Sequence, residues 1–211
     1  PAPDADGFYA TLISDAPYVI AADAGVSACL AARRVPDVCI GDFDSADPAD
    51  LERARRQGAE MHTYPARKDE SDLDLAIALA RSRGFSAVDI TAASSGRLDH
   101  TLAALGTLLR AAPMRARCLE PDFTAFAADA VFRPELALAC TRGATVSIFA
   151  VGCDAIVTSV GLSYPLEHTT LCPLSSLGLS NVASAPSQTI QVARGRVLVI
   201  ISESNGDVRS P

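Results

Sequence analysis

The chain has 211 residues, 49% of them hydrophobic and 20% charged, which is typical of a globular protein with one large or two small domains. Its formal net charge of −7 argues against a nucleic-acid-binding surface, which needs clustered lysine and arginine. No apolar run approaches the roughly 18 residues of a membrane-spanning helix, and the first residues do not resemble a signal peptide. The six cysteines lack C-x-x-C spacing, so we expect free thiols and a reducing, cytoplasmic location.

The first half of the chain alternates apolar runs with helix-like segments. We expect strands at residues 18–22, from 38, from 61 and at 87–93, and helices at 25–34, 48–57, from 71 to about 83, and at 101–112. Two helix starts carry specific signals. Pro48 follows Asp47 as a first helical residue follows an N-cap, and Ser71 with Asp74 has the spacing of a capping box. Pro113 should end the last of these helices.

Beyond about residue 115 the pattern changes. This part has no long helical periodicity and consists of short apolar runs separated by Gly, Pro and Ser. Strand candidates are residues 116–120, 145–151, 155–160 and 197–202. The change of pattern predicts two domains, the first of mixed α/β type and the second built from strands.

Four apolar runs of the first half give way to acidic segments. In an open parallel sheet, ligands bind at the carboxyl ends of the strands, so we expect these acids to converge on one edge. A rim of carboxylates favours a metal-bound anionic ligand, most simply Mg²⁺ with nucleotide phosphates. The four acidic segments contain Asp23, Asp42, Asp72 and Asp99.

Two of these segments have alternative interpretations. Asp42 and Asp44 stand two residues apart, so in an extended chain both project to the same side and can hold one hard cation; Asp44 could equally cap a turn. Residues 68–72 lead into a helix start, where backbone N–H groups favour phosphate and Lys68 adds a positive charge. Acids at a helix start also stabilise the helix without any ligand.

Residues 94–100 join a strand to a helix through a short polar loop. Gly96 permits close approach of the backbone to a ligand, and Arg97 can bind phosphate oxygens through two parallel hydrogen bonds. His100 is either a local hydrogen-bonding residue or a catalytic group. The concentration of acids, one lysine and one arginine at the same predicted edge favours the functional interpretation.

Motifs in this order resemble those of the thiamine pyrophosphokinases. They are Asp23-Ala24-Gly25, Gly41-Asp42-Phe43-Asp44-Ser45, Lys68-Asp69-Glu70-Ser71-Asp72-Leu73 and Gly96-Arg97-Leu98-Asp99-His100-Thr101, followed by segments 146–149, 161–166 and 179–181 that are similar to the family's thiamine-binding domain. The resemblance implies an N-terminal, mostly parallel (Rossmann-like) α/β catalytic domain over residues 1–124 and a smaller C-terminal all-β sandwich domain over residues 125–211. It also implies a homodimer whose active sites lie between subunits.

The activity that this resemblance implies is that of an ATP:thiamine diphosphotransferase, which gives thiamine diphosphate and AMP. Catalytic roles are implied for Asp42, Asp44, Asp72, Asp99 and Arg97, and Mg²⁺ ligation for the same four aspartates. ATP-binding roles are implied for Asp23, Gly25, Ser45, Lys68, Asp69, Ser71, Gly96 and His100, and thiamine contacts for Asp72, Ser180 and Asn181. Either Asp72 or Asp99 would accept the proton of the thiamine alcohol.

The chain departs from the family's motifs at several positions. Ala24 replaces a usual glycine, Ser27 a usual asparagine, and Val182 stands where an acidic residue commonly follows Ser-Asn. The first seventeen residues do not resemble the family's opening strand, and the chain has no tryptophan to stack on thiamine. Two alternatives therefore stay open: a related diphosphokinase for another primary alcohol such as a hydroxymethylpterin, and a non-catalytic nucleotide- or thiamine-binding module.

Overall fold

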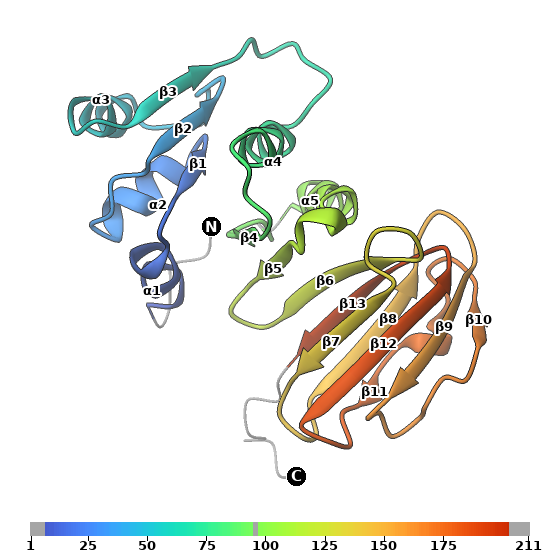
Figure 1. The fold of residues 1–211 in the computed structure, drawn as a ribbon. Coiled ribbons are helices and arrows are strands. Elements are labelled where there is room, and N and C mark those ends of the chain that lie inside the picture. Colours follow the sequence, from blue (N-terminus) through green and yellow to red (C-terminus); the bar gives the residue numbers. More distant parts are fainter. Residues whose placement is uncertain (1–6, 95–96, 203–211) are drawn as a thin grey trace. The chain divides into compact units, whose positions relative to one another are not determined.

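The computed structural model describes residues 7–94 and 97–202 (Figure 1). The chain divides into two compact units: unit 1 is Pro1–Ser86 with Thr91–Ala104, and unit 2 is Ala87–Ile90 with Leu105–Pro211. The chain is therefore of mixed α/β composition, and the domain boundary near residue 124 stays a prediction. In the described residues no helix combines the length and the apolar composition needed to cross a bilayer.

A three-stranded parallel sheet lies at the centre of unit 1. Strand β2 (Val38–Gly41) is its middle strand and pairs with β1 (Ile20–Ala22) on one side and β3 (Glu60–Thr63) on the other. All four residues of β2 are buried, as expected for a parallel strand covered on both faces. The helices that accompany these strands are α1 (Phe8–Asp15), α2 (Gly25–Ala31), α3 (Pro48–Arg56) and α4 (Asp72–Ser82).

The two faces of this sheet pack against different helices. On one face Cys39 belongs to a core with Ile13 of α1, Val26 of α2 and Ala54 of α3. On the other face Val38 and Ile40 pack with Ala76 of α4. The alternation along β2 follows from the two-residue period of a strand, which sends neighbouring side chains to opposite faces.

Both predicted helix starts are confirmed. The carboxylate of Asp47 accepts a hydrogen bond of 2.7 Å from the N–H of Ala49, and Pro48 is the first residue of α3. Ser71 caps α4 in a capping box with Asp74, so the helix begins at Asp72. This start matters for function because it fixes Asp72 in the first turn.

The fourth predicted strand does not join the parallel sheet. Strand β4 (Asp89–Thr91) lies instead at the edge of a six-stranded sheet of order β11-β8-β13-β6-β5-β4. Arg117 holds it there, since its side chain binds Asp89 with hydrogen bonds of 2.6 and 2.9 Å and its N–H binds the carbonyl of Val88. The expectation that four acidic strand ends share one edge of a single parallel sheet is therefore wrong.

Unit 2 consists mainly of two sheets. Besides β4, the six-stranded sheet contains β5 (Arg117–Leu119), β6 (Thr124–Asp129), β8 (Thr145–Ala150), β11 (Asn181–Val182) and β13 (Arg196–Ser202). The four-stranded sheet, of order β10-β9-β12-β7, contains β7 (Glu135–Ala139), β9 (Ala155–Val160), β10 (Thr169–Leu171) and β12 (Ser187–Arg194). Buried side chains from both sheets, such as Ile148 and Ile190, form one core.

Several elements differ from the sequence prediction. Helix α5 (Leu98–Arg110) begins three residues before the predicted start. It ends before Pro113, which belongs to the short 3₁₀ helix η1 (Ala112–Met114) that follows. A second 3₁₀ helix, η2 (Ser176–Gly178), precedes β11. The sequence reasoning named no element at α1 or at β6, β7, β10, β11 and β12, because most of these are short or rich in alanine and polar residues.

Candidate active site

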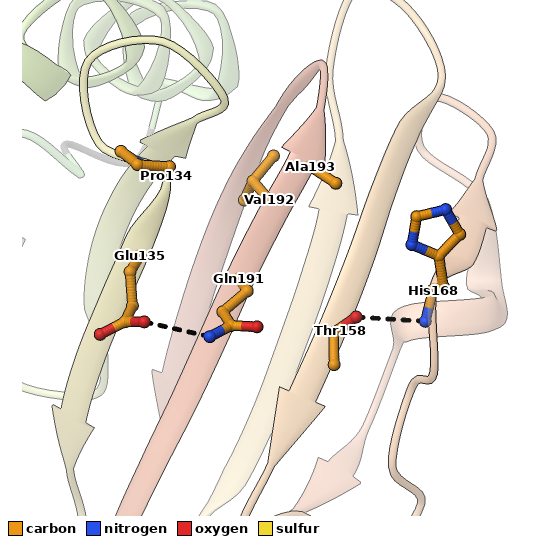
Figure 2. Close-up of a pocket in the computed structure, with 7 residues that line it drawn as sticks. All are labelled: Pro134, Glu135, Thr158, His168, Gln191, Val192 and Ala193. Atoms are coloured by element: carbon orange, nitrogen blue, oxygen red, sulfur yellow. Dashed lines mark hydrogen bonds between the residues drawn. The ribbon is translucent and has the colours of Figure 1, made fainter.

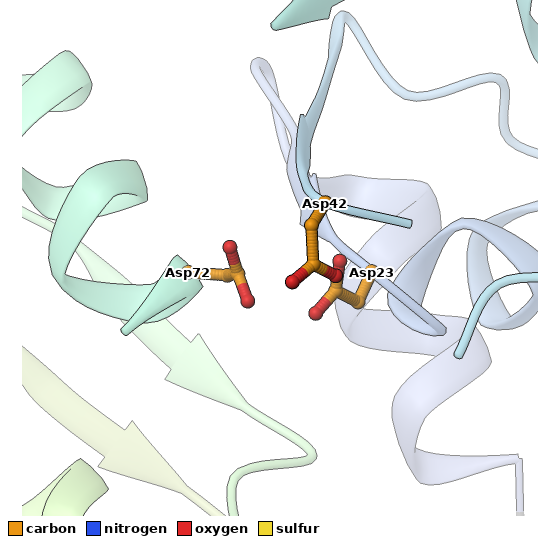
Figure 3. Close-up of side chains that lie close together, drawn as sticks. All are labelled: Asp23, Asp42 and Asp72. Carbon is orange, nitrogen blue, oxygen red and sulfur yellow. The ribbon is translucent and has the colours of Figure 1, made fainter. Parts of the chain in front are cut away.

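Three aspartates meet at one end of the parallel sheet in unit 1. Asp23 directly follows β1, Asp42 directly follows β2, and Asp72 is the first residue of α4. One carboxylate oxygen from each lies within 4.8 Å of the other two, and Figure 3 shows the three side chains facing one another. Because parallel strands end at the same edge of a sheet, β1 and β2 bring two of these acids together, and the capped start of α4 supplies the third.

The backbone around these acids adopts unusual conformations. Asp23 and Phe43 both have positive φ, 45° and 61°, and the N–H of Phe43 donates a 3.1 Å hydrogen bond to Asp23 Oδ1. Gly41 has φ 145°, and a methyl group added there would overlap the carboxylate of Asp23 and lie 3.3 Å from Asp72 Oδ1. Such strained positions persist where surrounding structure enforces them, and they concentrate at functional sites.

The cluster concentrates negative charge in a partly buried place. Burial, together with a hydrogen bond to Asp72, raises the pKa of Asp23 to about 7. The N–H of Asp44 donates a 3.1 Å hydrogen bond to Asp42 Oδ1, and this bond, assisted by Lys68, lowers the pKa of Asp42. Proton binding and cation binding are the two ways in which closely spaced carboxylates relieve their repulsion.

Lys68 contacts two of the three clustered aspartates. Its Nζ lies 3.0 Å from Asp72 Oδ1 and 3.6 Å from Asp42 Oδ2, and its side chain is 11% exposed. Asp72 Oδ1 is buried and accepts no hydrogen bond of good geometry from the described residues, so its contact with Lys68 is an ion pair. Three carboxylates facing one ammonium group leave a net negative site that suits a hard divalent cation.

The acid Asp44 lies outside this three-aspartate cluster. Phe43 between it and Asp42 has left-handed φ, so the chain here is not extended, which was the condition for both side chains to project to the same side. Asp44 and Ser45 are exposed. Their predicted roles in metal and ATP binding stay predictions.

The segment around Arg97 forms its own ion pair. Arg97 donates hydrogen bonds of 3.2 and 2.6 Å to the two carboxylate oxygens of Asp99, and both side chains are 66% exposed. This pairing lowers the pKa of Asp99 to about 2. His100 is exposed in the same first turn of α5, while Gly96 lies outside the described residues. The structure therefore does not bring Asp99 into the three-aspartate cluster.

Three further predicted ATP-binding residues lie at or near helix starts in unit 1. Gly25 begins α2 and Ser71 is the N-cap of α4, whereas Asp69 is exposed in the loop between β3 and α4. Ser71 already accepts the N–H of Asp74, which supports the structural interpretation of its hydroxyl. Their contacts with ATP stay predictions.

The predicted thiamine-binding residues lie in unit 2. The Asn181 side chain is buried, accepts hydrogen bonds of 3.0 and 2.9 Å from the N–H groups of Tyr164 and Val182, and donates to the carbonyl of Tyr164. Ser180 is exposed with φ 56°, and its N–H binds the hydroxyl of Ser147. Asn181 thus holds the loop that carries Tyr164, a link that the sequence reasoning missed because the two residues lie 17 positions apart.

A groove of about 380 Å³ crosses the four-stranded sheet of unit 2 (Figure 2). Two hydrogen bonds join residues of its lining: the Gln191 side chain donates to Glu135 at 3.1 Å, and the backbone N–H of His168 donates to the hydroxyl of Thr158 at 3.2 Å. The groove is lined by Pro134, Glu135, Thr158, His168, Gln191, Val192 and Ala193, none of which the sequence predicted as a site residue. The three-aspartate cluster is therefore the better candidate.

The family resemblance places Asp23 near the nucleotide and the metal but does not name it as a metal ligand, whereas in the structure it belongs to the cluster. A signal for this placement exists in the chain, because Asp23 ends its strand just as Asp42 ends the next one. The positive φ of Asp23, by contrast, has no clear signature in the sequence. Position at a strand end was thus the more informative feature.

Comparisons with known proteins identify a family that matches the first part of this chain. Residues 9–119, more than half of the chain, match the family described as thiamin pyrophosphokinase, catalytic domain. A thiamine pyrophosphokinase of Bacillus subtilis (strain 168) is 35% identical over 83 residues, which is 39% of this chain and 39% of that relative. The matched family region contains all three clustered aspartates.

Solved structures show a similar fold over most of the chain. A thiamine pyrophosphokinase from Bacillus subtilis has a TM-score of 0.80 at 24% identity, covering 93% of this chain and 92% of that one. A thiamin pyrophosphokinase from Candida albicans has a TM-score of 0.77 at 13% identity, covering 91% and 83%. At such identities the likeness concerns the fold.

Proposed function

The chain belongs to the thiamin pyrophosphokinase family, and we propose that it transfers the diphosphate group of ATP to the hydroxyethyl group of thiamine, giving thiamine diphosphate and AMP. The observation that carries this proposal is the cluster of Asp23, Asp42 and Asp72 inside the matched region. Neither alternative, the pterin-type diphosphokinase or the binding module, has an observation of its own in its favour.

The three-aspartate cluster fits Mg²⁺. Its oxygens are hard ligands from three different elements, their spacing lets one cation contact all three, and Asp72 Oδ1 has no aligned hydrogen bond to lose. When bound, the cation would offset the negative charge of the polyphosphate at the attacked phosphorus. Asp44 and Asp99 remain proposed additional ligands from the sequence.

Asp72 and Asp99 are the two candidates for the group that accepts the proton of the thiamine alcohol, and their electrostatic surroundings differ. Asp99 is ion-paired with Arg97, and a carboxylate whose pKa is about 2 is a weak base. Asp72 has no arginine partner in the described structure, and its ammonium partner Lys68 is shared with Asp42. This contrast favours Asp72, with Arg97 available to phosphate oxygens once it leaves Asp99.

Further features of the proposal come from the family resemblance. We propose a Rossmann-like catalytic domain over residues 1–124, a β-sandwich over residues 125–211, and a cytoplasmic homodimer with active sites between subunits. The parallel sheet with helices on both faces and the single core shared by two antiparallel sheets support this arrangement. Ser180 and Asn181 are the proposed contacts to the aminopyrimidine ring of thiamine.

The experiment that tests the function measures AMP release from ATP and Mg²⁺ with and without thiamine, together with thiamine diphosphate as its fluorescent oxidation product. Equal amounts of AMP and thiamine diphosphate are expected. A hydroxymethylpterin serves as the alternative acceptor. If AMP formed with it but not with thiamine, the chain would be a diphosphokinase for that alcohol and the proposal would be wrong. Thiamine binding without any AMP would leave a binding module.

A further inference from the structure

Lys68 is the only lysine in the 211-residue chain. Of the 18 lysine and arginine residues, the other 17 are arginine, so this sequence uses guanidinium groups almost everywhere that it places a positive side chain. The single exception contacts the three-aspartate cluster. A lysine at position 68 needs a physical explanation, because arginine and lysine differ in more than size.

Three arginine ion pairs among the described residues have a different geometry from that of Lys68. Arg117 holds Asp89, Arg97 holds Asp99 and Arg55 holds Glu52, each through two nitrogens of the guanidinium fork on one carboxylate. The Lys68 ammonium instead touches two carboxylates that come from different elements. It also donates a 3.4 Å hydrogen bond to the carbonyl of Pro65 in its own loop.

The carboxylates that Lys68 contacts are also two of the proposed metal ligands. Mg²⁺ binds oxygen at about 2.0–2.1 Å. Since Nζ lies 3.0 Å from Asp72 Oδ1, a cation on that oxygen would lie within about 5 Å of the ammonium, where two positive charges in a partly buried site repel strongly. This repulsion sets the two cations in competition for Asp72.

We infer that Lys68 is a tethered counter-cation that competes with Mg²⁺ for Asp42 and Asp72 and is displaced from them when the metal binds. The inference rests on the proposed function, because it takes the three-aspartate cluster as the metal site. An ammonium group suits this exchange, because it is a compact charge on a flexible side chain and does not form the two parallel hydrogen bonds by which a guanidinium group binds a carboxylate. The displaced ammonium then becomes available to the phosphate groups that accompany the metal.

The first experiment uses the fact that the chain carries a single ε-amine. The intact protein is treated with an amine-acylating reagent, and the rate of Lys68 acylation is followed by peptide mass spectrometry with MgCl₂ or with NaCl at equal ionic strength. Displacement from the carboxylates predicts a several-fold faster acylation in saturating MgCl₂. An equal or slower rate in MgCl₂ would overturn the inference, because the ammonium would then stay in place.

The second experiment measures Mn²⁺ affinity by electron paramagnetic resonance, which needs neither nucleotide nor turnover. Lys68→Met removes the competitor and should raise Mn²⁺ affinity about tenfold. Lys68→Arg keeps the charge but adds a bidentate fork, so Mn²⁺ affinity should fall below that of the unchanged protein. Unchanged or weakened Mn²⁺ binding in Lys68→Met contradicts competition.

Arg67→Gln is the matched control, because it removes an exposed positive charge one residue away. Competition at the carboxylates predicts little change in Arg67→Gln, whereas a mere effect of net charge would raise Mn²⁺ affinity equally in both variants and so overturn the inference. Thermal unfolding of each variant establishes that it is folded.

The outcomes also separate this inference from the proposed function. If Mn²⁺ does not bind the unchanged protein, the metal site itself fails and the inference fails with it. If Mn²⁺ binds and Asp42→Asn abolishes binding, but the acylation rate of Lys68 does not respond to MgCl₂, the metal site stands and only the role of Lys68 is rejected.

Discussion

Two acidic regions of unit 1 looked alike in the sequence and differ in the folded chain. In the three-aspartate cluster, Lys68 is shared between Asp42 and Asp72, and the pKa of Asp23 is raised to about 7. Asp99, in the other region, forms an ion pair with Arg97, and this pairing is the main reason that its pKa is lowered to about 2. The pKa of an aspartate is thus shifted in opposite directions in the two regions. Burial and neighbouring carboxylates raise it in the cluster, whereas the paired guanidinium lowers it at Asp99.

A sequence motif therefore determines where a carboxylate lies, whereas the groups around that carboxylate in the folded chain determine its charge state. A carboxylate already neutralised by its own arginine has less to gain from a metal ion than carboxylates that repel one another. We therefore expect metal binding to depend chiefly on the three-aspartate cluster. The following four predictions test that difference, beginning with the largest effect.

The first prediction compares Asp42→Asn with Asp99→Asn. Asp42→Asn removes a ligand of the cluster and should lower turnover by about 10³-fold and abolish measurable Mn²⁺ binding. Asp99→Asn should lower Mn²⁺ affinity much less, by about tenfold at most, because Asp99 stands outside the cluster and is at most an additional ligand. Electron paramagnetic resonance and the AMP assay measure both, with exposed Glu70→Gln as the charge control. Equal loss of Mn²⁺ binding in both aspartate variants would erase the distinction.

The second prediction concerns Gly41→Ala. The added methyl group would overlap the Asp23 carboxylate, and the backbone at φ 145° disfavours any residue with a side chain. We expect a loss of about 1–3 kcal/mol in the free energy of unfolding, together with weaker Mn²⁺ binding, both measured on the same sample by urea denaturation and metal titration. Gly58→Ala, at φ 99° but with open space around it, is the matched control for backbone strain alone. If both variants bound Mn²⁺ equally well, the close packing around Asp23 would be irrelevant to the metal.

The third prediction concerns pH in the absence of metal. Asp23 has its folded pKa raised to about 7 from 3.8, so between these values the folded state binds more protons than the unfolded chain. The contribution of Asp23 to the free energy of unfolding is therefore fully present below pH 4 and lost as the pH rises through 7. Metal affinity should change in the opposite direction and increase from pH 5 to pH 8, because Mn²⁺ competes with that proton. Asp23→Asn should flatten the Asp23 part of the stability profile, and a profile identical to that of the unchanged protein would refute the assignment.

The fourth and smallest effect is expected for Arg97→Gln. Without its guanidinium partner the pKa of Asp99 should return upward from about 2 toward its ordinary range, measured by the carboxyl carbon resonance of Asp99 during acid titration. The free energy of unfolding at pH 7 should hardly change, since both side chains are largely exposed. A pKa of Asp99 that stays low would mean that the start of α5, and not Arg97, causes the shift.

The fold was predictable where local signals were strong. The N-cap of Asp47 with Pro48 and the capping box of Ser71 with Asp74 appeared in the sequence and in the structure, because both depend only on residues up to three positions apart. Strand β4 was located correctly but assigned to the wrong sheet. Its partner is chosen by Arg117, which lies 28 positions away from Asp89.

The candidate site shows the same division. The sequence by itself determined which chemical groups are present at the strand ends and helix starts, since strand periodicity and capping are local properties. Only the tertiary structure decided that Asp23 joins Asp42 and Asp72, that Asp99 pairs with Arg97, and that Lys68 is shared between two carboxylates. Such pairings depend on distances of a few ångströms between segments far apart in the chain, and charge interactions at that range outweigh the preferences of any single motif.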